Sequence, residues 1–269
     1  MLEPPKYPDI VKSHFVRKWK VDTSWDILNP KTWKFCYLRE VQAIDNDKLL
    51  ISDVWDYKLK LYDVNGKILG VTKRSPYSIY REDSEFIYEV KNKELNISDK
   101  NGNCVYTDKL SISNPGGMFL YDDLLYISDM ERNRIYVCDR KGQYVRQWGV
   151  FGKRDGQFIS PGNLIVDENK LYMMDVGNNR IQIFDLEGKH LSTWKGPHSF
   201  NSWSGISSNN KSIFYSDTNN SRIIVSPKLD ISGDIFIIDQ KCPGSISATD
   251  NNMYCINYFS NEVNIYDVL

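Results

Sequence analysis

One phrase recurs along this chain and limits its fold more than any other feature. An apolar strand ends in Asp, a polar loop follows, a second strand with alternating apolar residues begins, and a tight turn ends in Gly. The phrase is clearest at residues 126–142 and 172–188, and a weaker copy stands at 50–66. The residue that ends the first of these strands recurs in steps of 36, 40, 46, 42 and 40 residues: Asp53, Glu89, Asp129, Asp175, Asp217 and Asn257. A period of about 40 residues built from short strands is typical of a radial β-array.

Each repeat contains four strand signals, which we call strands a to d from first to last. In the fourth repeat they are expected over four ranges: 163–166, 170–174, 180–184 and 190–194. Residues alternate between apolar and polar within these ranges, and Gly188 provides the positive φ of a tight c–d turn. Six landmarks without an intervening linker predict an all-β, six-bladed β-propeller of four-stranded blades, in a single domain spanning residues 1–269.

The ends of the chain indicate how such a ring would close. Strand d carries an apolar-x-x-Trp pattern, and the same pattern stands near the N-terminus at Val16–Trp19. The C-terminal residues 261–267 have the pattern of a strand c. We therefore expect an N-terminal strand of about residues 13–20 to complete the sixth blade, which would remove its free edge.

Residues 152–162, Gly-Lys-Arg-Asp-Gly-Gln-Phe-Ile-Ser-Pro-Gly, followed by the Asp175-to-Gly188 phrase, resemble an NHL repeat. The match is strongest in the third and fourth repeats, and the shared spacing extends it over nearly the whole chain. The resemblance implies a six-bladed propeller, which agrees with the count of landmarks. The NHL family includes protein-binding and RNA-binding modules, and distant propeller relatives are lyases and lactonases. No RING, B-box or coiled coil precedes the repeats, so we expect a propeller similar to those of TRIM-NHL proteins without the ubiquitin-ligase part.

Composition favours a soluble protein of ordinary type. Apolar residues make up 41% of the chain, the formal net charge is −1, and no apolar run reaches the roughly 18 residues of a membrane span. The five Cys form no C-x-x-C pair, and the N-terminus lacks the apolar region of a signal peptide. We expect a cytoplasmic, monomeric protein without membrane association, whose reduced thiols, such as Cys138, are buried.

An Arg stands five residues after the landmark Asp in three repeats. The pairs are Asp129 with Arg134, Asp175 with Arg180, and Asp217 with Arg222. Three arginines on one rim would suit an anion-binding ring. We favour a structural role instead, in which each Arg forms a bidentate ion pair with its Asp across the b–c loop.

The tryptophans fall into two groups. Trp19, Trp148 and Trp194 share one repeat position, which predicts packing beneath the outer strand. Trp55 and Trp203 have less regular surroundings, in a b–c loop and at the entry to a strand a. These loops lie on one face, so both tryptophans are candidates for exposed aromatic contacts, with ordinary loop packing as the alternative.

Charged residues separate by loop type. The a–b turns are acidic, and within them the sequence supplies only a few basic residues: Lys48, Arg81, Lys170 and Lys211. The d–a connections on the opposite face are mostly basic, with clusters at 73–74 and 153–154. We therefore expect a dipolar molecule whose basic face attracts an acidic protein or the phosphates of RNA.

The pattern gives little support for catalysis. The three histidines, His14, His190 and His198, have no partner at ligand spacing, and the innermost strands are apolar or hydroxylated. The Asp-x-x-Gly turns resemble fragments of calcium loops, but they recur in successive blades as hairpins. We expect no catalytic residues, no metal and no cofactor, and a lyase-like or lactonase-like enzyme is the least favoured hypothesis.

The sequence thus predicts a non-catalytic interaction scaffold that uses its d–a and b–c loops. The proposed contact residues are aromatic or basic: Trp55, Tyr57, Lys73, Arg74, Lys153, Arg154 and Trp203. The expected partner is a protein. Single-stranded RNA is the alternative, because its bases stack on exposed aromatic rings while Lys and Arg contact its phosphates.

Overall fold

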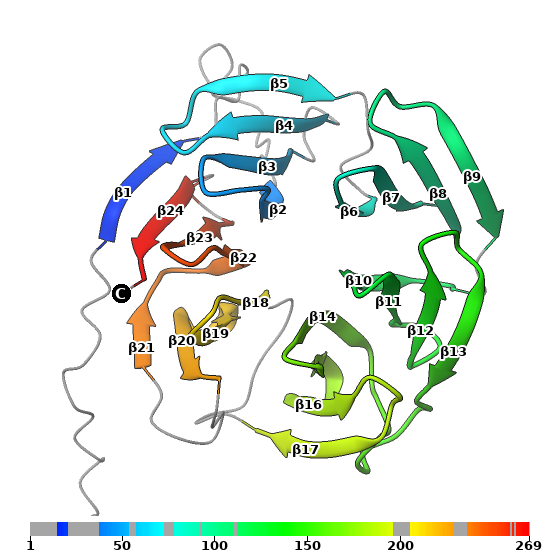
Figure 1. Ribbon diagram of the computed structural model, residues 1–269. Coiled ribbons are helices and arrows are strands. Elements are labelled where there is room, and N and C mark those ends of the chain that lie inside the picture. Colours follow the sequence, from blue (N-terminus) through cyan, green and yellow to red (C-terminus); the bar gives the residue numbers. More distant parts are fainter. Residues whose placement is uncertain are drawn as a thin grey trace, which may run out of the picture. The chain divides into compact units, whose positions relative to one another are not determined.

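The computed structural model describes residues 15–20, 38–53, 58–72, 78–91, 93–109, 112–195, 205–228, 236–258, 260 and 262–268. These residues form six antiparallel sheets of four strands each, as Figure 1 shows. Two short 3₁₀ turns, Val176–Asn178 and Thr218–Asn220, are the only helical segments among the described residues. The chain is therefore an all-β, six-bladed propeller with four-stranded blades.

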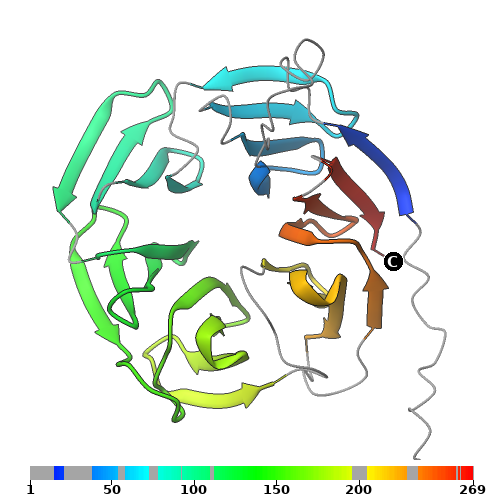
Figure 2. The same cartoon turned by 180° about the vertical axis from the view of Figure 1, so that it is seen from behind.

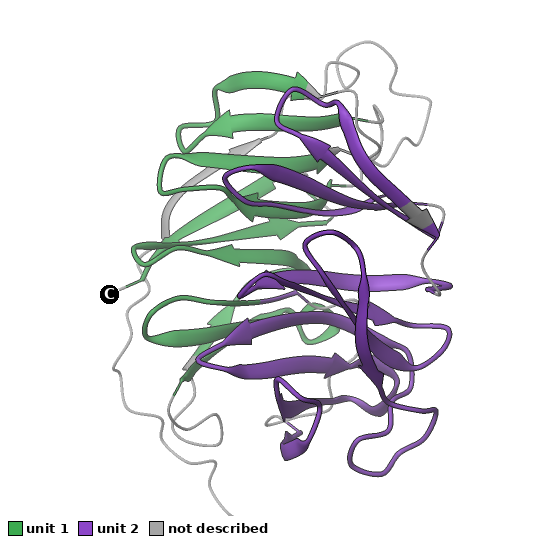
Figure 3. Ribbon diagram, turned by 45° about the vertical axis from the view of Figure 1, so that its right-hand side comes forward, with its two compact units in different colours: residues 1–73, 207–269 green, residues 74–206 purple. Residues whose placement is uncertain are grey.

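Residues 74–206 form one of two compact units, drawn in purple in Figure 3, and contain the second, third and fourth blades. The second blade consists of β6 (Ile79–Glu82), β7 (Phe86–Lys91), β8 (Glu94–Asp99) and β9 (Cys104–Lys109). The third consists of β10 (Pro115–Tyr121), β11 (Leu124–Asp129), β12 (Arg134–Asp139) and β13 (Tyr144–Trp148). The fourth consists of β14 (Pro161–Asp167), β15 (Lys170–Asp175), β16 (Arg180–Asp185) and β17 (His190–Trp194).

Residues 1–73 and 207–269 form the other unit, which contains the first and sixth blades and nearly all of the fifth. The first blade consists of β2 (Leu38–Ala43), β3 (Lys48–Asp53), β4 (Lys58–Asp63) and β5 (Ile68–Thr72). The fifth consists of β18 (Ile206–Ser208), β19 (Ser212–Asp217), β20 (Arg222–Pro227) and β21 (Phe236–Asp239). The sixth contains β22 (Pro243–Ala248), β23 (Asn252–Asn257), β24 (Glu262–Asp267) and the N-terminal β1 (Phe15–Lys20). Figure 2 shows the same sheets from behind.

The N-terminal strand joins the sheet of the sixth blade. β1 pairs antiparallel with β24, and its Trp19 lies opposite Val263 in the register. The side chains of Val16 and Trp19, which we expected to pack, lie outside the described residues. The closure of the ring by this strand remains a prediction.

The four strands predicted for the fourth repeat are confirmed. β14 to β16 extend one to three residues beyond the predicted ranges, and β17 has the predicted bounds. The c–d turns share one set of hydrogen bonds, which explains why the Asp-x-x-Gly pattern recurs. In four blades the Oδ1 atom of the turn's Asp accepts hydrogen bonds from the amides two and four residues later: Asp63, Asp99, Asp139 and Asp185. These carboxylates hold hairpins, as predicted for the Asp-x-x-Gly turns.

Within each compact unit, the described core lies between the faces of neighbouring blades. Tyr126 and Val137 of the third blade pack with Leu164 and Phe184 of the fourth, and all four are at most 1% exposed. A polar contact adds to this packing, because the Ser128 hydroxyl donates to the carbonyl of Gly162 at 2.6 Å. Burial of such large apolar side chains provides most of the free energy that holds one blade against the next.

The cysteines partly follow the prediction. Cys138 and Cys255 are buried, and burial raises the pKa of each thiol to about 12, which makes both unreactive. Cys104 is exposed, so the expectation of buried thiols is wrong for this residue. The reason is its place at the start of β9, which is an edge strand of its sheet among the described residues. Cys36 lies outside the described residues.

A cluster around Arg140 corrects the expected charge of the a–b turns. This arginine, from the c–d turn of the third blade, forms ion pairs with Asp83 at 2.6 Å, Asp123 at 3.1 Å and Glu85 at 3.4 Å. Its Nε atom also donates to the Tyr88 hydroxyl at 3.0 Å. The negative charge of these turns is therefore partly neutralised by a basic residue from a neighbouring c–d turn. A count of charges in the a–b turns alone does not include this residue.

No helix among the described residues is long and apolar enough to cross a membrane. Within the same ranges, no three His, Cys, Asp or Glu side chains gather as metal ligands would.

Candidate functional site

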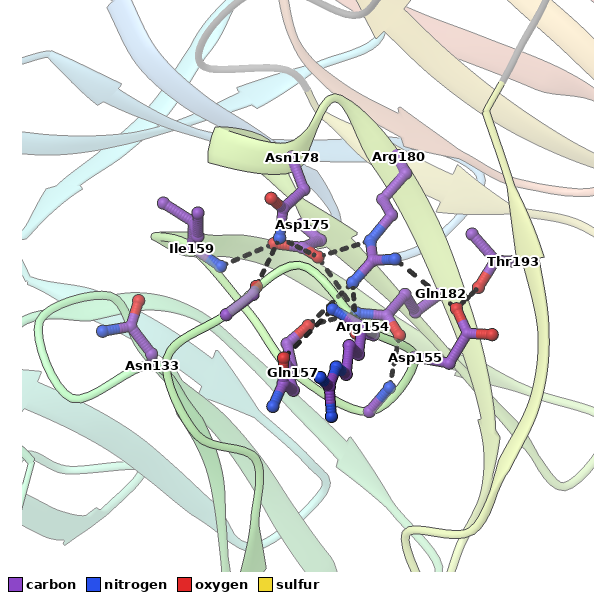
Figure 4. Close-up of polar contacts among 12 residues, drawn as sticks. Asn133, Arg154, Asp155, Gln157, Ile159, Asp175, Asn178, Arg180, Gln182 and Thr193 are labelled. Atoms are coloured by element: carbon purple, nitrogen blue, oxygen red, sulfur yellow. Dashed lines mark hydrogen bonds and ion pairs between the residues drawn. The ribbon is translucent and has the colours of Figure 1, made fainter.

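A hollow of about 660 Å³ opens on the fourth blade where the d–a loop of residues 149–160 meets the end of β17. Its lining is mostly basic: Lys153, Arg154, Asp155, Arg180, Thr193, Trp194 and Lys195. The first three come from the loop, Arg180 opens β16, and the others end β17 or follow it. Figure 4 shows how the loop lies against these strands.

The loop is held at one end by a buried carboxylate. Asp175 is fully buried and accepts the amide of Ile159 at 2.8 Å through Oδ1. Its Oδ2 atom accepts Nδ2 of Asn178 at 2.8 Å, Nε of Arg180 at 2.7 Å and Nε2 of Gln182 at 3.0 Å. A buried charge requires partners of this kind, because its desolvation would otherwise be very unfavourable.

Arg180 connects this carboxylate to the tip of the loop. The residue is 6% exposed, and its Nη2 atom donates to the backbone carbonyls of Arg154 at 2.7 Å and Gln157 at 2.9 Å. Its Nη1 atom lies 3.5 Å from Oδ1 of Asp155. The guanidinium therefore bridges strand and loop, with a single bond to Asp175 and not the bidentate pair that we expected.

A glutamine in the middle of β16 also holds the loop. Gln182 is fully buried, accepts the amide of Gly156 at 2.8 Å and donates to the carbonyl of Gln157 at 2.7 Å. Gly156 has a φ of 79°, in the left-handed region where a glycine is favoured. These bonds fix the turn that directs Lys153 and Arg154 toward solvent.

The last part of the loop is held by the core. Phe158 is fully buried and packs on Phe184 with ring centroids 5.6 Å apart. The amide of Ser160 donates to Oδ1 of Asn133 in the third blade at 2.9 Å. The loop thus has little freedom to rearrange, and a ligand would meet an arrangement formed before it binds.

The electrostatics of the hollow are positive. Four basic side chains and one carboxylate line it, which gives a formal charge of +3, or +2 when Asp175, the partner of Arg180, is included. Lys153, Arg154 and Lys195 are exposed, and none of the three has an ion pair with a described residue. Three cations from two segments therefore converge on one opening.

Asp155, the acidic residue of the lining, belongs to a short polar chain. The Thr193 hydroxyl donates to Oδ1 of Asp155 at 2.8 Å, and Nε2 of His190 lies 2.8 Å from the same hydroxyl. A carboxylate can only accept, so the single hydroxyl proton points to Asp155 and His190 must be the donor to Thr193. This direction is the reverse of that by which a histidine activates a hydroxyl nucleophile.

Five of the predicted contact residues lie outside the described residues: Trp55, Tyr57, Lys73, Arg74 and Trp203. Lys153 and Arg154 are described, and the structure brings them together with Trp194 and Lys195 at the hollow. Trp148 packs as predicted, with its ring centroid 6.1 Å from that of Phe184. Trp194, for which the sequence predicts the same packing, is half-buried and also lines the hollow. The buried Gln182 was overlooked, although a polar residue between Ile181 and Ile183 was a visible signal.

The three Asp–Arg pairs differ between blades. In the fifth, Nε and Nη2 of Arg222 both donate to Oδ2 of Asp217, at 2.8 and 2.7 Å. In the fourth, Arg180 divides its donors between Asp175 and the loop. In the third, Asp129 is fully buried and accepts four backbone amides: Ser113, Asn114, Glu131 and Arg132. In the fourth and fifth blades the arginine is already paired with its own carboxylate, so it cannot serve as part of an anion-binding ring.

Comparison with known proteins supports the fold. A family model described as a 6-bladed beta-propeller matches residues 105–268, which is more than half of the chain. The family is described by its propeller and not by NHL repeats, so the NHL resemblance remains a prediction. No curated protein matches the chain.

Several solved structures have a similar architecture. A streptogramin B lyase is 14% identical with a TM-score of 0.65, over 94% of this chain and 87% of that one. A catalytically inactive virginiamycin B lyase from Staphylococcus aureus, solved with quinupristin, is 13% identical with a TM-score of 0.63, over 94% and 99%. The beta-propeller domain of Cps50 (Swd1) from Myceliophteria thermophila is 10% identical with a TM-score of 0.62, over 89% and 99%. At such identities the similarity shows the fold alone.

Proposed function

The chain belongs to a family of 6-bladed beta-propellers, and from this premise we propose that it is a non-catalytic interaction scaffold. Its ligand is an anionic segment of a partner protein, which binds in the hollow of the fourth blade. The observation that supports this most directly is the convergence of Lys153, Arg154 and Lys195 on one opening, beside a loop that buried polar residues hold in place.

The chemistry of the lining favours carboxylates as ligands. Exposed Lys and Arg side chains that lack a partner among the described residues attract anions, and Arg binds a carboxylate through two parallel hydrogen bonds. The backbone of the loop is already fixed by Asp175, Arg180 and Gln182. Binding therefore loses less conformational entropy than it would on a flexible loop, and affinity is higher for the same contacts.

The polar chain beside the hollow supports a non-catalytic role. Thr193 is the hydroxyl of the lining, and its proton is directed to Asp155. His190 donates to that hydroxyl and so cannot act on it as a base in this arrangement. The lyases with similar folds share only 13–14% of their residues with this chain, so we do not extend their activity to it.

Single-stranded RNA is the second candidate, because Trp194 lies beside the cations and an aromatic ring can stack on a base. A protein segment is favoured by the placement of the charges. The described cations of the hollow converge on one point, whereas a nucleic acid backbone is usually contacted by basic residues spread along a path.

Biolayer interferometry with immobilised polymers tests the proposal. Poly-L-glutamate, poly-L-lysine and poly-uridylate are presented to the wild type and to Lys153→Glu/Arg154→Glu. The matched control is Lys170→Glu/Lys189→Glu, which changes the charge equally at two exposed sites of the same blade outside the hollow. We expect poly-L-glutamate to bind the wild type. Its affinity for Lys153→Glu/Arg154→Glu, the hollow variant, should be about tenfold lower. Two attractive interactions are lost and two repulsive ones are gained, each of ~0.2–1 kcal/mol.

The control variant is expected to change the affinity about two-fold or less, because its charges are farther from the ligand. Equal binding by both variants would show that the hollow is not the site. Preferential binding of poly-uridylate, lost in the hollow variant, would support the RNA hypothesis and reject the proposed protein segment.

A further inference from the structure

Two apolar side chains are exposed at the beginning of the loop that forms the hollow. Val150 is 60% exposed and Phe151 is 69% exposed, the two largest values among the described large apolar residues. Phe151 forms an isolated β-bridge with Phe158, which is fully buried. The loop thus places one of two bridged phenylalanines in the core and the other in solvent.

The exposed pair lies next to the cations of the hollow. Phe151 precedes Lys153 by two residues, so their Cα atoms are at most about 7.6 Å apart. The amide of Gly152 donates to the carbonyl of Phe158 at 3.0 Å, and the amide of Phe158 donates to the carbonyl of Val150 at 2.9 Å. The backbone that carries Val150 and Phe151 is therefore held by the same rigid loop as Lys153 and Arg154.

From these observations we propose that the partner segment is acidic and also carries a bulky apolar side chain. Its carboxylates bind Lys153, Arg154 and Lys195, while the apolar side chain packs on Val150 and Phe151. This inference rests on the proposed function and adds the second chemical property of the ligand. Charge complementarity selects this occupant, because the apolar pair borders a net positive opening.

The two contacts act differently. Exposed ion pairs mainly accelerate association and set the preference for acidic partners, whereas burial of apolar surface slows dissociation. An aromatic ring on a fixed loop is a common anchor of protein interfaces. RNA bases would stack on Phe151 but would gain little from the aliphatic Val150, so an amphipathic peptide fits the pair better.

Three synthetic peptides of equal length test the inference by fluorescence anisotropy. The first has four Glu with Gly and Ser between them, the second has the same four Glu with one Leu and one Phe, and the third has the Leu and Phe without Glu. The variant Val150→Ser/Phe151→Ser is compared with the wild type. Leu69→Ser/Val71→Ser on β5 is the matched control, because its two apolar side chains are 45% and 53% exposed.

We expect the second peptide to bind the wild type about tenfold more tightly than the first, since it buries additional apolar surface. Val150→Ser/Phe151→Ser should abolish this difference and leave the affinity for the first peptide unchanged. Leu69→Ser/Val71→Ser should retain it. The third peptide should bind most weakly, because it lacks the charges that the hollow selects.

Equal affinities of the first and second peptides for the wild type would overturn the inference and leave the proposed function intact. Failure of both to bind would instead reject the proposed function. Sedimentation velocity provides an independent check. Self-association of the wild type that disappears in Val150→Ser/Phe151→Ser would show that the pair binds a second copy of this chain, and would also overturn the inference.

Discussion

The substitution Asp175→Asn tests the physical basis of the loop that forms the hollow. It preserves the size of the side chain but removes the negative charge that accepts four hydrogen bonds. Arg180 then keeps a positive charge that is 6% exposed, and its remaining acidic neighbour, Asp155, is 3.5 Å away and itself 62% exposed. The new amide group would also direct N–H donors toward Ile159, Asn178, Arg180 or Gln182.

The expected loss of stability follows from this burial. Removing one partner of a buried ion pair lowers the free energy of unfolding by about 3–5 kcal/mol. In a chain of this size, 1 kcal/mol corresponds to about 2 °C in Tm, so we expect Asp175→Asn to melt about 6–10 °C below the wild type. Differential scanning calorimetry at pH 7 measures the change.

Two further variants identify the cause. Asp155→Asn removes an exposed carboxylate and should lower the free energy of unfolding by less than about 1 kcal/mol. Asp175→Asn/Arg180→Gln removes both buried charges and should melt above Asp175→Asn, since no unpaired charge remains. If Asp175→Asn melts within about 2 °C of the wild type, the buried carboxylate does not hold the loop and the reasoning is refuted.

Three other predictions concern the blades. Deleting residues 1–20 removes β1 and leaves the edge of β24 (Glu262–Asp267) unpaired. Because unpaired edges promote aggregation, light scattering should detect aggregates of this variant. A variant that stays monomeric would argue against the closure by β1. Gly149 has a φ of 98°, and a Cβ there would clash with the ring of Phe158, so Gly149→Ala should lower the free energy of unfolding by about 1–3 kcal/mol in urea titration. Arg140→Met should lower the free energy of unfolding by about 1 kcal/mol at pH 6, measured in the same way. Burial opposes a low pKa for Asp83, but the amides of Phe86 and Glu85, the Tyr88 hydroxyl and Arg140 together hold this pKa below its ordinary value. The stability that ionised Asp83 contributes is thus present above about pH 4 and is lost as the pH falls further. The difference in the free energy of unfolding between the wild type and Arg140→Met should therefore become smaller in acid. A difference that grows there would contradict the assignment.

The strands could be predicted from the sequence because each follows a local rule. Alternating apolar residues and an Asp-x-x-Gly turn define β16 and β17, and the turn is held by Asp185 through amides two and four residues away. Such contacts are visible within a window of about ten residues. The same locality explains why the six repeats gave the correct fold class without reference to long-range contacts.

The hollow could be predicted only in part, because it depends on contacts between distant segments. The sequence identifies Lys153 and Arg154 as basic loop residues. Their proximity to Trp194 and Lys195 depends on the fold, because β17 ends beside the loop. Arg180 was expected to bond Asp175 alone, whereas its Nη2 atom binds carbonyls 23 and 26 residues earlier. Sequence spacing does not reveal which carbonyls a folded loop turns toward an arginine.

Reversing the charge of the hollow tests the central claim most directly. In Lys153→Glu/Arg154→Glu/Lys195→Glu, the formal charge of the lining changes from +3 to −3. Isothermal titration calorimetry would compare the four-Glu peptide with a four-Lys peptide of the same length, against wild type and variant. We predict that the wild type binds the Glu peptide and not the Lys peptide, that the variant does the opposite, and that both affinities fall as salt is added. An unchanged Kd of the variant for the Glu peptide would contradict the claim that this hollow binds the partner.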